Sequence, residues 1–289
     1  MSKKRSNKNT NYYLFILSPP YSGSTLLSKI LGTSPEISSL PKEGQSVDGV
    51  SHVMPGSVLL KNPELEVPWK FVKRQWEQKY WDLTQQILLE KSPSNIHRAF
   101  EIQNHFYPSS FIALIRNPYA FCEGYERRKR RRTYQEGARL WVRCAQSQRQ
   151  NVERLKRVVQ IRYEDLTDDT KTTLRRIEAF MPELREIQTS DVPTQTLLGR
   201  QSNIRNINDI KIKKLTQYDI RKTNGILERY EELVSFFGYK IRDPKENSRI
   251  KSLIYNTKPK IIRMLRYLNR IKVLPNKLKN RIEKYVIEQ

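Results

Sequence analysis

Residues 18–27, SPPYSGSTLL, have the composition of a loop that can bind an anion. They follow the apolar run YYLFIL and precede a helix-like pattern of leucine and isoleucine. A strand, a small polar loop with glycine and a helix N-terminus gather backbone N–H groups around a phosphate-like group. The lysine of an ordinary phosphate loop is absent, and Tyr21 stands where a cation is expected. The sequence therefore predicts an anion site that lacks its usual positive charge.

Two other segments place a charged residue directly after an apolar run. Lys91 follows QILLE (86–90), and Arg116 follows FIALI (111–115) and opens the tripeptide Arg-Asn-Pro. A guanidinium can form two parallel hydrogen bonds to one phosphate group. In a parallel sheet the carboxyl ends of the strands lie along one edge, where ligands bind. We therefore expect both cations to lie near the loop at 18–24.

The elements that would position these residues alternate between strands and helices. Segments 42–68 and 182–212 lack a strong periodicity. The alternation elsewhere predicts an α/β domain with a central parallel sheet and helices on both faces. Strands are predicted at 12–17, 36–40, 86–90, 111–115 and 158–163. Helices are predicted at 24–32 with Ser22 or Ser24 as N-cap, at 69–81, at 92–106 with Ser92 or Ser94 as N-cap, from Pro118 to about Lys156, from Asp168 or Asp169 to Phe180, and at 215–239 up to Gly238.

The composition limits the class of protein. The chain has 289 residues and a formal net charge of +24. No apolar stretch is long enough to span a bilayer, and the first apolar run is too short for the core of a secretory signal. Two cysteines, Cys122 and Cys144, and three scattered histidines predict neither a disulfide framework nor a metal site. We expect a soluble, cytoplasmic protein whose charge suits an anionic ligand, an anionic membrane face or nucleic acid.

The charge divides the chain into three expected regions. Residues 1–11 form a disordered basic tail, 12–244 the α/β domain, and 245–289 a basic helical extension that holds 13 Lys and Arg against three glutamates. The extension can be interpreted as amphipathic helices lying on an anionic membrane. It can also pack its apolar face on the domain, and this interpretation is favoured because most amphipathic helices face a core.

Four motifs in order give the chain a family resemblance. SPPYSGSTLL, EKSP, FIALIRNPYAF and RYEDL resemble the sulfotransferases that use 3′-phosphoadenosine 5′-phosphosulfate (PAPS), in the branch of the tyrosylprotein and many bacterial enzymes. The resemblance runs from about Tyr13 to Tyr239. It implies a P-loop-like, three-layer α/β/α domain that transfers a sulfuryl group without a metal.

The resemblance also implies the residues that bind the donor. The 5′-phosphosulfate would lie on Tyr21, Ser22, Gly23, Ser24, Thr25 and Leu26, and Arg116 would bind the 3′-phosphate. The family usually adds a serine eight residues after this arginine, where this chain has Gly124. Arg127 or Arg128 is the candidate substitute. Ser202, assisted by Arg200, would contact the donor from a closing loop.

Two residues are implied in catalysis. Lys91 would stabilise the charge that develops on the bridging oxygen, and Glu43 would act as the general base that takes the acceptor's proton. Glu36 is a less favoured base, and His52 is an alternative because other members use histidine. Tyr163 and Glu164 of RYEDL are interpreted as structural. An acceptor hydroxyl or amine is implied, and the aromatic, basic stretch 69–81 and the tail favour a carbohydrate or glycolipid.

Three other functions compete with sulfuryl transfer. A nucleotide kinase or ATPase would need the sequence GxxxxGK[ST], and no lysine precedes Ser24 or Thr25. A nucleic-acid-binding protein would suit the charge of +24, although no nucleic-acid partner is expected from the motifs. A relative that has lost donor binding would suit Tyr21 and Gly124. The sequence does not indicate an oligomeric state.

Overall fold

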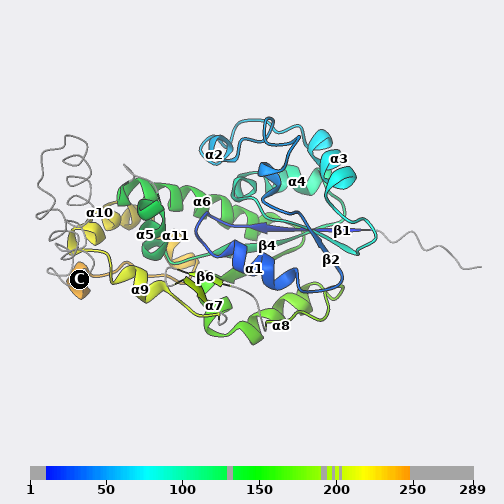
Figure 1. Ribbon diagram of the computed structural model, residues 1–289. Helices are drawn as coiled ribbons and strands as arrows, with labels where there is room; N and C mark the ends of the chain where they lie inside the picture. Colours follow the sequence, from blue (N-terminus) through cyan, green and yellow to red (C-terminus); the bar gives the residue numbers. More distant parts are fainter. Residues whose placement is uncertain (1–10, 129–132, 190–193, 197–198, 202–203, 248–289) are drawn as a thin grey trace, which may run out of the picture.

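The central sheet has the parallel arrangement that the sequence predicts. The computed structural model describes residues 11–128, 133–189, 194–196, 199–201 and 204–247. Within these residues five parallel strands pair in the order β2-β3-β1-β4-β5 (Figure 1). All five were predicted, with ends that differ by a few residues at most. Their bounds are β1 Tyr12–Leu17, β2 Ile37–Ser39, β3 Ile87–Glu90, β4 Ser109–Ile115 and β5 Val158–Arg162.

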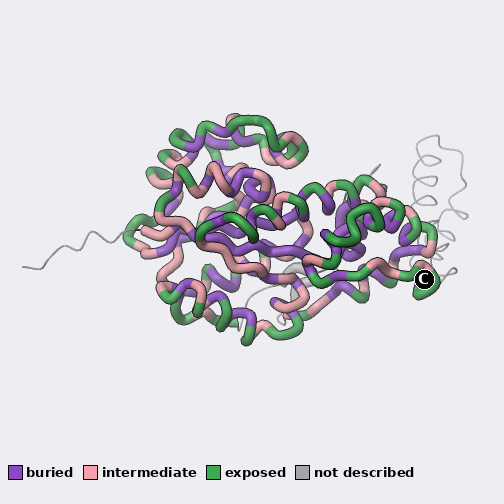
Figure 2. Tube along the Cα trace, turned by 180° about the vertical axis from the view of Figure 1, so that it is seen from behind, coloured by how far each residue is buried: buried purple, intermediate pink, exposed green. Residues whose placement is uncertain are grey.

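The strand β1 packs its alternate side chains into two different cores, because successive side chains of a strand point to opposite faces. Phe15 lies in one core with Trp76 of α3 (Trp69–Lys79) and Ile102 of α4 (Ala99–His105). Leu14 and Ile16 lie in the other core, with Leu27 of α1 (Ser24–Leu31). Figure 2 shows the buried residues concentrated along the strands and the inner faces of the helices. The fold is therefore a three-layer α/β/α domain.

A third core joins the helices at one end of the sheet. It includes side chains of α5 (Pro118–Arg128), α6 (Tyr134–Arg154), α10 (Gln217–Leu227) and α11 (Glu231–Phe236). Gln148 of α6 donates from Nε2 to the carbonyls of Leu17 (2.8 Å) and Leu114 (3.1 Å), near the ends of β1 and β4. This core therefore attaches directly to the edge of the sheet where the predicted site lies.

Several predicted helices begin or end differently. Gly23, not Ser22 or Ser24, is the N-cap of α1, and the described side chains give it no capping hydrogen bond. Residues 92–106 form two helices, η2 (Pro93–His97) and α4, because Arg98 leaves the helical conformation with φ −125° and ψ 18°. The region 215–239 is divided by the short helix η3 (Glu228–Tyr230), and Gly238 ends it with φ 75° as predicted.

Helices also occur where none was predicted. RYEDL opens α7 (Tyr163–Asp168). The helix α8 (Thr170–Phe180) that follows was predicted, and Asp169 caps it by accepting from the Thr172 N–H at 3.0 Å. In the aperiodic segments the described residues form short elements: η1 (Gly44–Ser46), α2 (Gly56–Leu59), the antiparallel strands β6 (Thr194–Thr196) and β7 (Gly199–Gln201), and α9 (Asn208–Ile212). A last short helix, η4 (Pro244–Glu246), ends the described chain.

The stretch 69–81 has a different role from the one expected. Trp69, Trp76 and Trp81 are buried in the core above the sheet and stack edge to face on one another or on Phe106. They are therefore core residues and offer no aromatic surface to an acceptor. Phe71 is the aromatic residue of this stretch that stays exposed, at 40%.

The described helices include none that is both long and apolar enough to cross a membrane. Cys122 and Cys144 are free and buried. The expected basic tail at 1–10 and most of the extension, 248–289, lie outside the described residues.

Candidate functional site

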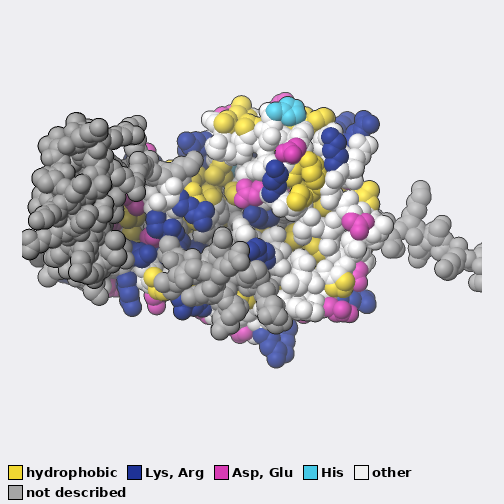
Figure 3. Space-filling model, in the orientation of Figure 1, with side chains coloured by type: hydrophobic (Ala, Val, Ile, Leu, Met, Phe, Trp, Pro, Cys, Tyr) yellow, Lys and Arg dark blue, Asp and Glu magenta, His cyan; other side chains and the backbone are white. Residues whose placement is uncertain are grey.

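The three loops singled out in the sequence follow strands that are neighbours in the sheet. β1 pairs with β3 on one side and with β4 on the other, all in parallel. The loop 18–23, Lys91 and Arg116 therefore leave the sheet at the same edge. Figure 3 shows several Lys and Arg side chains near α5 and α9, and others elsewhere on the same face.

The loop between β1 and α1 is shaped by two residues with positive φ. Tyr21 has φ 64° and Gly23 has φ 92°. A Cβ added at Gly23 would lie 2.5 Å from Cδ2 of Tyr163, so only glycine fits against that ring. The hydroxyl of Ser22 is buried and donates to the carbonyl of Pro20 at 3.5 Å, whereas Thr25 is exposed. The loop thus presents its backbone and the α1 N-terminus, as an anion site requires.

Arg116 is buried beneath this loop, with 4% of its surface exposed. Its guanidinium stacks on the ring of Tyr163, 3.7 Å from Cζ to the ring centroid. Nε donates to Asn208 Oδ1 at 2.8 Å, and Nη1 donates to the carbonyl of Tyr21 at 3.1 Å. Nη2 is buried and has no hydrogen-bond partner among the described residues. Burial lowers the pKa of Arg116, and an unpaired buried donor on a charged group is costly unless a ligand binds it.

A buried lysine occupies the space beside Gly124. A Cβ added at Gly124 would lie 3.0 Å from Nζ of Lys211 and 3.2 Å from Cβ of Tyr21. Lys211 belongs to α9, which packs on α5, and only 5% of its side chain is exposed. Of the two predicted substitutes, Arg127 pairs with Glu123 at 2.7 Å, and Arg128 lies over the Tyr21 ring.

Lys91 contacts both Glu43, the expected base, and Thr25, at the start of α1. Its Nζ lies 3.0 Å from Glu43 Oε1 and 3.3 Å from the hydroxyl of Thr25. The other carboxylate oxygen of Glu43 accepts from Gln45 Nε2 at 2.7 Å. About a third of the Glu43 side chain is exposed, at 33%, so it can reach a substrate. The structure therefore brings Glu43, Lys91 and Thr25 together.

Glu90, directly before Lys91, fixes the segment that carries Glu43. It is buried and accepts from the Gly44 N–H at 2.9 Å, from the Ser92 hydroxyl and from Asn95 Nδ2. Burial raises the pKa of Glu90 to about 7. Ser92 is the N-cap residue of η2, as predicted, but its hydroxyl donates to Glu90 and makes no capping hydrogen bond. Glu90 was not predicted as a site residue, although a carboxylate at the end of a buried strand is a visible signal in the sequence.

Tyr163 and Glu164 support the site from below, as the sequence analysis proposed. The Tyr163 ring packs against Gly23, and the guanidinium of Arg116 stacks on the same ring. Glu164 accepts from the Asn117 N–H at 3.0 Å, from Asn208 Nδ2 and from the Tyr239 hydroxyl at 2.7 Å. Asn208 and Tyr239 were missed, because nothing in the local sequence predicts which distant residues meet this carboxylate.

Four other candidates are not part of this cluster as described. Glu36 precedes β2 and therefore lies at the opposite edge of the sheet. His52 is exposed and contacts the ring of Phe71, 6.1 Å between centroids. Arg200 lies in β7, where side chains are not described, and Ser202 lies outside the described residues. The described part of the chain holds no group of three or more metal-ligating side chains.

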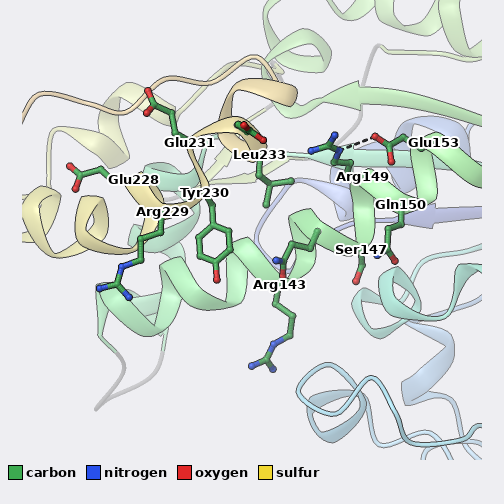
Figure 4. A pocket seen from close by; sticks show the side chains of 12 residues that line it. Arg143, Ser147, Arg149, Gln150, Glu153, Glu228, Arg229, Tyr230, Glu231 and Leu233 are labelled. Carbon is green, nitrogen blue, oxygen red and sulfur yellow. Dashed lines mark hydrogen bonds and ion pairs between the residues drawn. The ribbon is translucent and has the colours of Figure 1, made fainter.

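A separate cavity of about 850 Å³ lies between α6 and the segment from η3 to α11 (Figure 4). Arg143, Arg149, Glu153 and Glu231 are among its lining residues, and Arg149 pairs with Glu153 at 2.8 Å. None of the site residues described above lines it. This cavity is therefore distinct from the candidate site.

The fold and the site have the architecture of a P-loop-like α/β transferase, with an anion loop after the first strand and a buried arginine after the fourth. The sulfotransferase family model matches residues 14–183, and the chain belongs to this family of enzymes. No curated protein gave a significant sequence match.

One solved sulfotransferase domain shares the fold, and two further solved sulfotransferases give lower TM-scores. The domain from the curacin biosynthetic pathway aligns with a TM-score of 0.50 and 20% identity, over 81% of this chain and 100% of its own. The domain from the Synechococcus PCC 7002 olefin synthase gives a TM-score of 0.46 and 23% identity, over 80% of this chain and 98% of its own. The sulfotransferase from Alicyclobacillus acidocaldarius gives a TM-score of 0.43 and 14% identity, over 76% of this chain and 96% of its own.

Proposed function

We propose that the chain transfers the sulfuryl group of PAPS to an acceptor hydroxyl or amine. The observation that carries this proposal is Arg116 Nη2, a buried charged donor for which the described residues supply no acceptor. A 3′-phosphate would satisfy it. The anion loop with Gly23 at φ 92° would hold the 5′-phosphosulfate on the same edge of the sheet. The residues present therefore fit this donor.

The residues around Lys91 suit the transfer step. When bound, PAPS supplies the sulfuryl group and a bisphosphate leaving group. Lys91 contacts Thr25 of the anion loop and Glu43 in the same arrangement. It can therefore stabilise the negative charge that would develop on the bridging oxygen of the donor as the S–O bond breaks. Glu43 can accept the acceptor's proton, and it is held in place by Lys91 and Gln45.

The acceptor is less well supported than the donor. The preference for a carbohydrate or glycolipid loses one of its two supports, because the tryptophans of 69–81 are core residues. The other support, the basic tail, lies mostly outside the described residues. The proposal is therefore a hydroxyl or amine acceptor, with a carbohydrate or glycolipid as the class to test first.

Calorimetric titration tests donor binding without an acceptor. Adenosine 3′,5′-bisphosphate, ATP and a short DNA duplex are titrated into the full chain at one salt concentration. We expect tight binding of the bisphosphate, and weak or no binding of the others. Binding of DNA alone, with a steep salt dependence, would overturn the proposal in favour of a nucleic-acid-binding protein.

Two substitutions test the transfer step by the rate of PAPS consumption. Glu43→Gln should lower the turnover number by roughly 10²–10⁴, the usual contribution of a general base, and leave bisphosphate binding unchanged. Lys91→Met should lower it by roughly 10²–10³. Lys42→Met is the matched control, because Lys42 adjoins Glu43 but pairs with the exposed Asp48. Full turnover by the Glu43 variant would refute the role of Glu43.

A further inference from the structure

The region around Gly124 holds more buried positive charge than its carboxylates balance. Lys211 and Arg116 are buried there, whereas Arg127 is exposed. Burial lowers the pKa of Lys211, the charges of Arg116, Arg127 and Arg128 lower it further, and the charge of Glu123 opposes them. Glu123 is the nearest carboxylate, and Arg127 already bonds to it at 2.7 Å. The Lys211–Glu123 separation of 3.7 Å is longer than a hydrogen bond. Buried cations in such excess are costly unless an anion joins them.

The position of Lys211 connects it to Arg116. Both residues are held by α9: Asn208 bonds to Arg116 Nε at 2.8 Å, and Lys211 follows three residues later on the same helix. Residues three apart on a helix lie on the same side. Burial lowers the pKa of Lys211 to about 7, and the charge of Arg116 is close enough to contribute to this lowering. The Lys211 amino group and the unpaired Nη2 of Arg116 therefore belong to one small region.

The amino group of Lys211 occupies the place where a side chain at position 124 would begin. It lies 3.0 Å from an added Cβ there, and Tyr21 borders the same space. Its hydrogen bond to the Ala120 carbonyl, at 3.3 Å, uses one of its three protons. The ammonium group thus has donors left for a ligand that enters beside the loop.

We propose that Lys211 is a second cation for the 3′-phosphate of the donor and acts together with Arg116. The proposal rests on the proposed function, since it names a further residue of the same donor site. It gives a physical reason for the small residue at position 124, because Lys211 needs that space. It also places a positive charge beside Tyr21, where the loop lacks its own.

The test compares two nucleotides that differ by one group, adenosine 3′,5′-bisphosphate and adenosine 5′-monophosphate. The ratio of their dissociation constants, measured by calorimetry at pH 7, reports what the 3′-phosphate contributes. Lys211→Met should reduce this ratio by roughly 10- to 100-fold, the usual effect of losing a charge-assisted hydrogen bond. Lys213→Met is the matched control, since Lys213 is exposed on the same helix end, and it should leave the ratio within about twofold.

A second readout separates ligand binding from a structural role. The second ionisation of a phosphate has a pKa of about 6, so the nucleotide is fully ionised at pH 8. Lys211, with its pKa near 7, must then take up a proton when the bisphosphate binds. Calorimetry at pH 8 in buffers of different ionisation enthalpy should detect this uptake in the wild type and not in Lys211→Met.

The outcomes distinguish the possible failures. A wild type that shows no preference for the bisphosphate would refute the donor site as a whole. If a folded Lys211→Met protein prefers the bisphosphate over the monophosphate as strongly as the wild type does, the role of Lys211 is refuted and the donor site is not. If the single variant does not fold, Glu123→Gln with Lys211→Met removes the buried pair together, a change that proteins tolerate better than loss of one partner. An unchanged ratio in that double variant would refute the inference equally.

Discussion

Replacing Glu90 by glutamine should change how the stability of the protein depends on pH. The buried carboxyl has a pKa of about 7 instead of the ordinary 4.5, because burial penalises its charge. Between these two values the folded chain binds this proton more tightly than the unfolded chain does. The free energy of unfolding therefore falls as pH rises through this window, by about 1.4 kcal/mol per pH unit and about 3 kcal/mol in total.

Glutamine is a suitable replacement because it mimics the protonated acid. Its carbonyl oxygen can still accept from the Gly44 N–H. The side-chain oxygen of Asn95 is buried and has no partner among the described residues. After rotation of the Asn95 amide, that oxygen can accept from the new NH₂ group. The variant should therefore keep the segment around Glu43 in place.

Urea denaturation of both proteins at fixed ionic strength, at pH 4.5 and pH 7.5, measures the effect. From pH 4.5 to pH 7.5, the free energy of unfolding of the Glu90→Gln protein should rise by about 3 kcal/mol relative to that of the wild type. Groups common to both proteins cancel in this difference. Parallel stability curves for wild type and variant would show that the carboxyl ionises normally and would refute this account of its environment.

Three further substitutions have expected outcomes in thermal denaturation and in bisphosphate titration. Gly23→Ala should lower the free energy of unfolding by about 1–3 kcal/mol and weaken bisphosphate binding, because the new Cβ would lie 2.5 Å from the Tyr163 ring. The control Gly225→Ala has nothing within 4 Å of the new Cβ and should not destabilise the protein. Equal behaviour of the two variants would contradict the packing argument. Arg98→Met should cost about 3 kcal/mol or more, because Arg98 donates to the carbonyls of Leu59, Asn62, Leu65 and Ser94, and a normal melting temperature would contradict this role. Tyr21→Arg should lower the melting temperature and should not speed turnover, because the new guanidinium would repel that of Arg128, which lies 5.2 Å from the Tyr21 ring. Faster turnover would contradict this and would mean that catalysis is limited by the missing charge in the loop.

The strands and the loops that follow them could be predicted because their signals are local. A strand buried on both faces is a continuous apolar run, as in YYLFIL and FIALI. A charged residue directly after a predicted strand, as after QILLE and FIALI, then marks the edge of the sheet. Lys91 and Arg116 were found in this way, and the geometry of both agrees with the expected positions, while their chemical roles stay predictions.

The parts that could not be predicted depend on distant residues. Lys211 stands among lysines and isoleucines and has the pattern of a solvated helix face, yet packing of α9 on α5 buries it. Arg98 interrupts a helical pattern because its guanidinium bonds to carbonyls 33 to 39 residues earlier in the chain. Gly23 replaces the predicted serine cap because the Tyr163 ring, far along the sequence, fills the space beside it. In each case a tertiary contact overrides a local preference.

A crystal structure of the chain with adenosine 3′,5′-bisphosphate would test the central claim most directly. The account predicts the 3′-phosphate within hydrogen-bond distance of Arg116 Nη2 and Lys211 Nζ, and the 5′-phosphate against the backbone N–H groups of residues 22–26. A nucleotide bound in the reverse orientation, or bound away from Arg116, would contradict it.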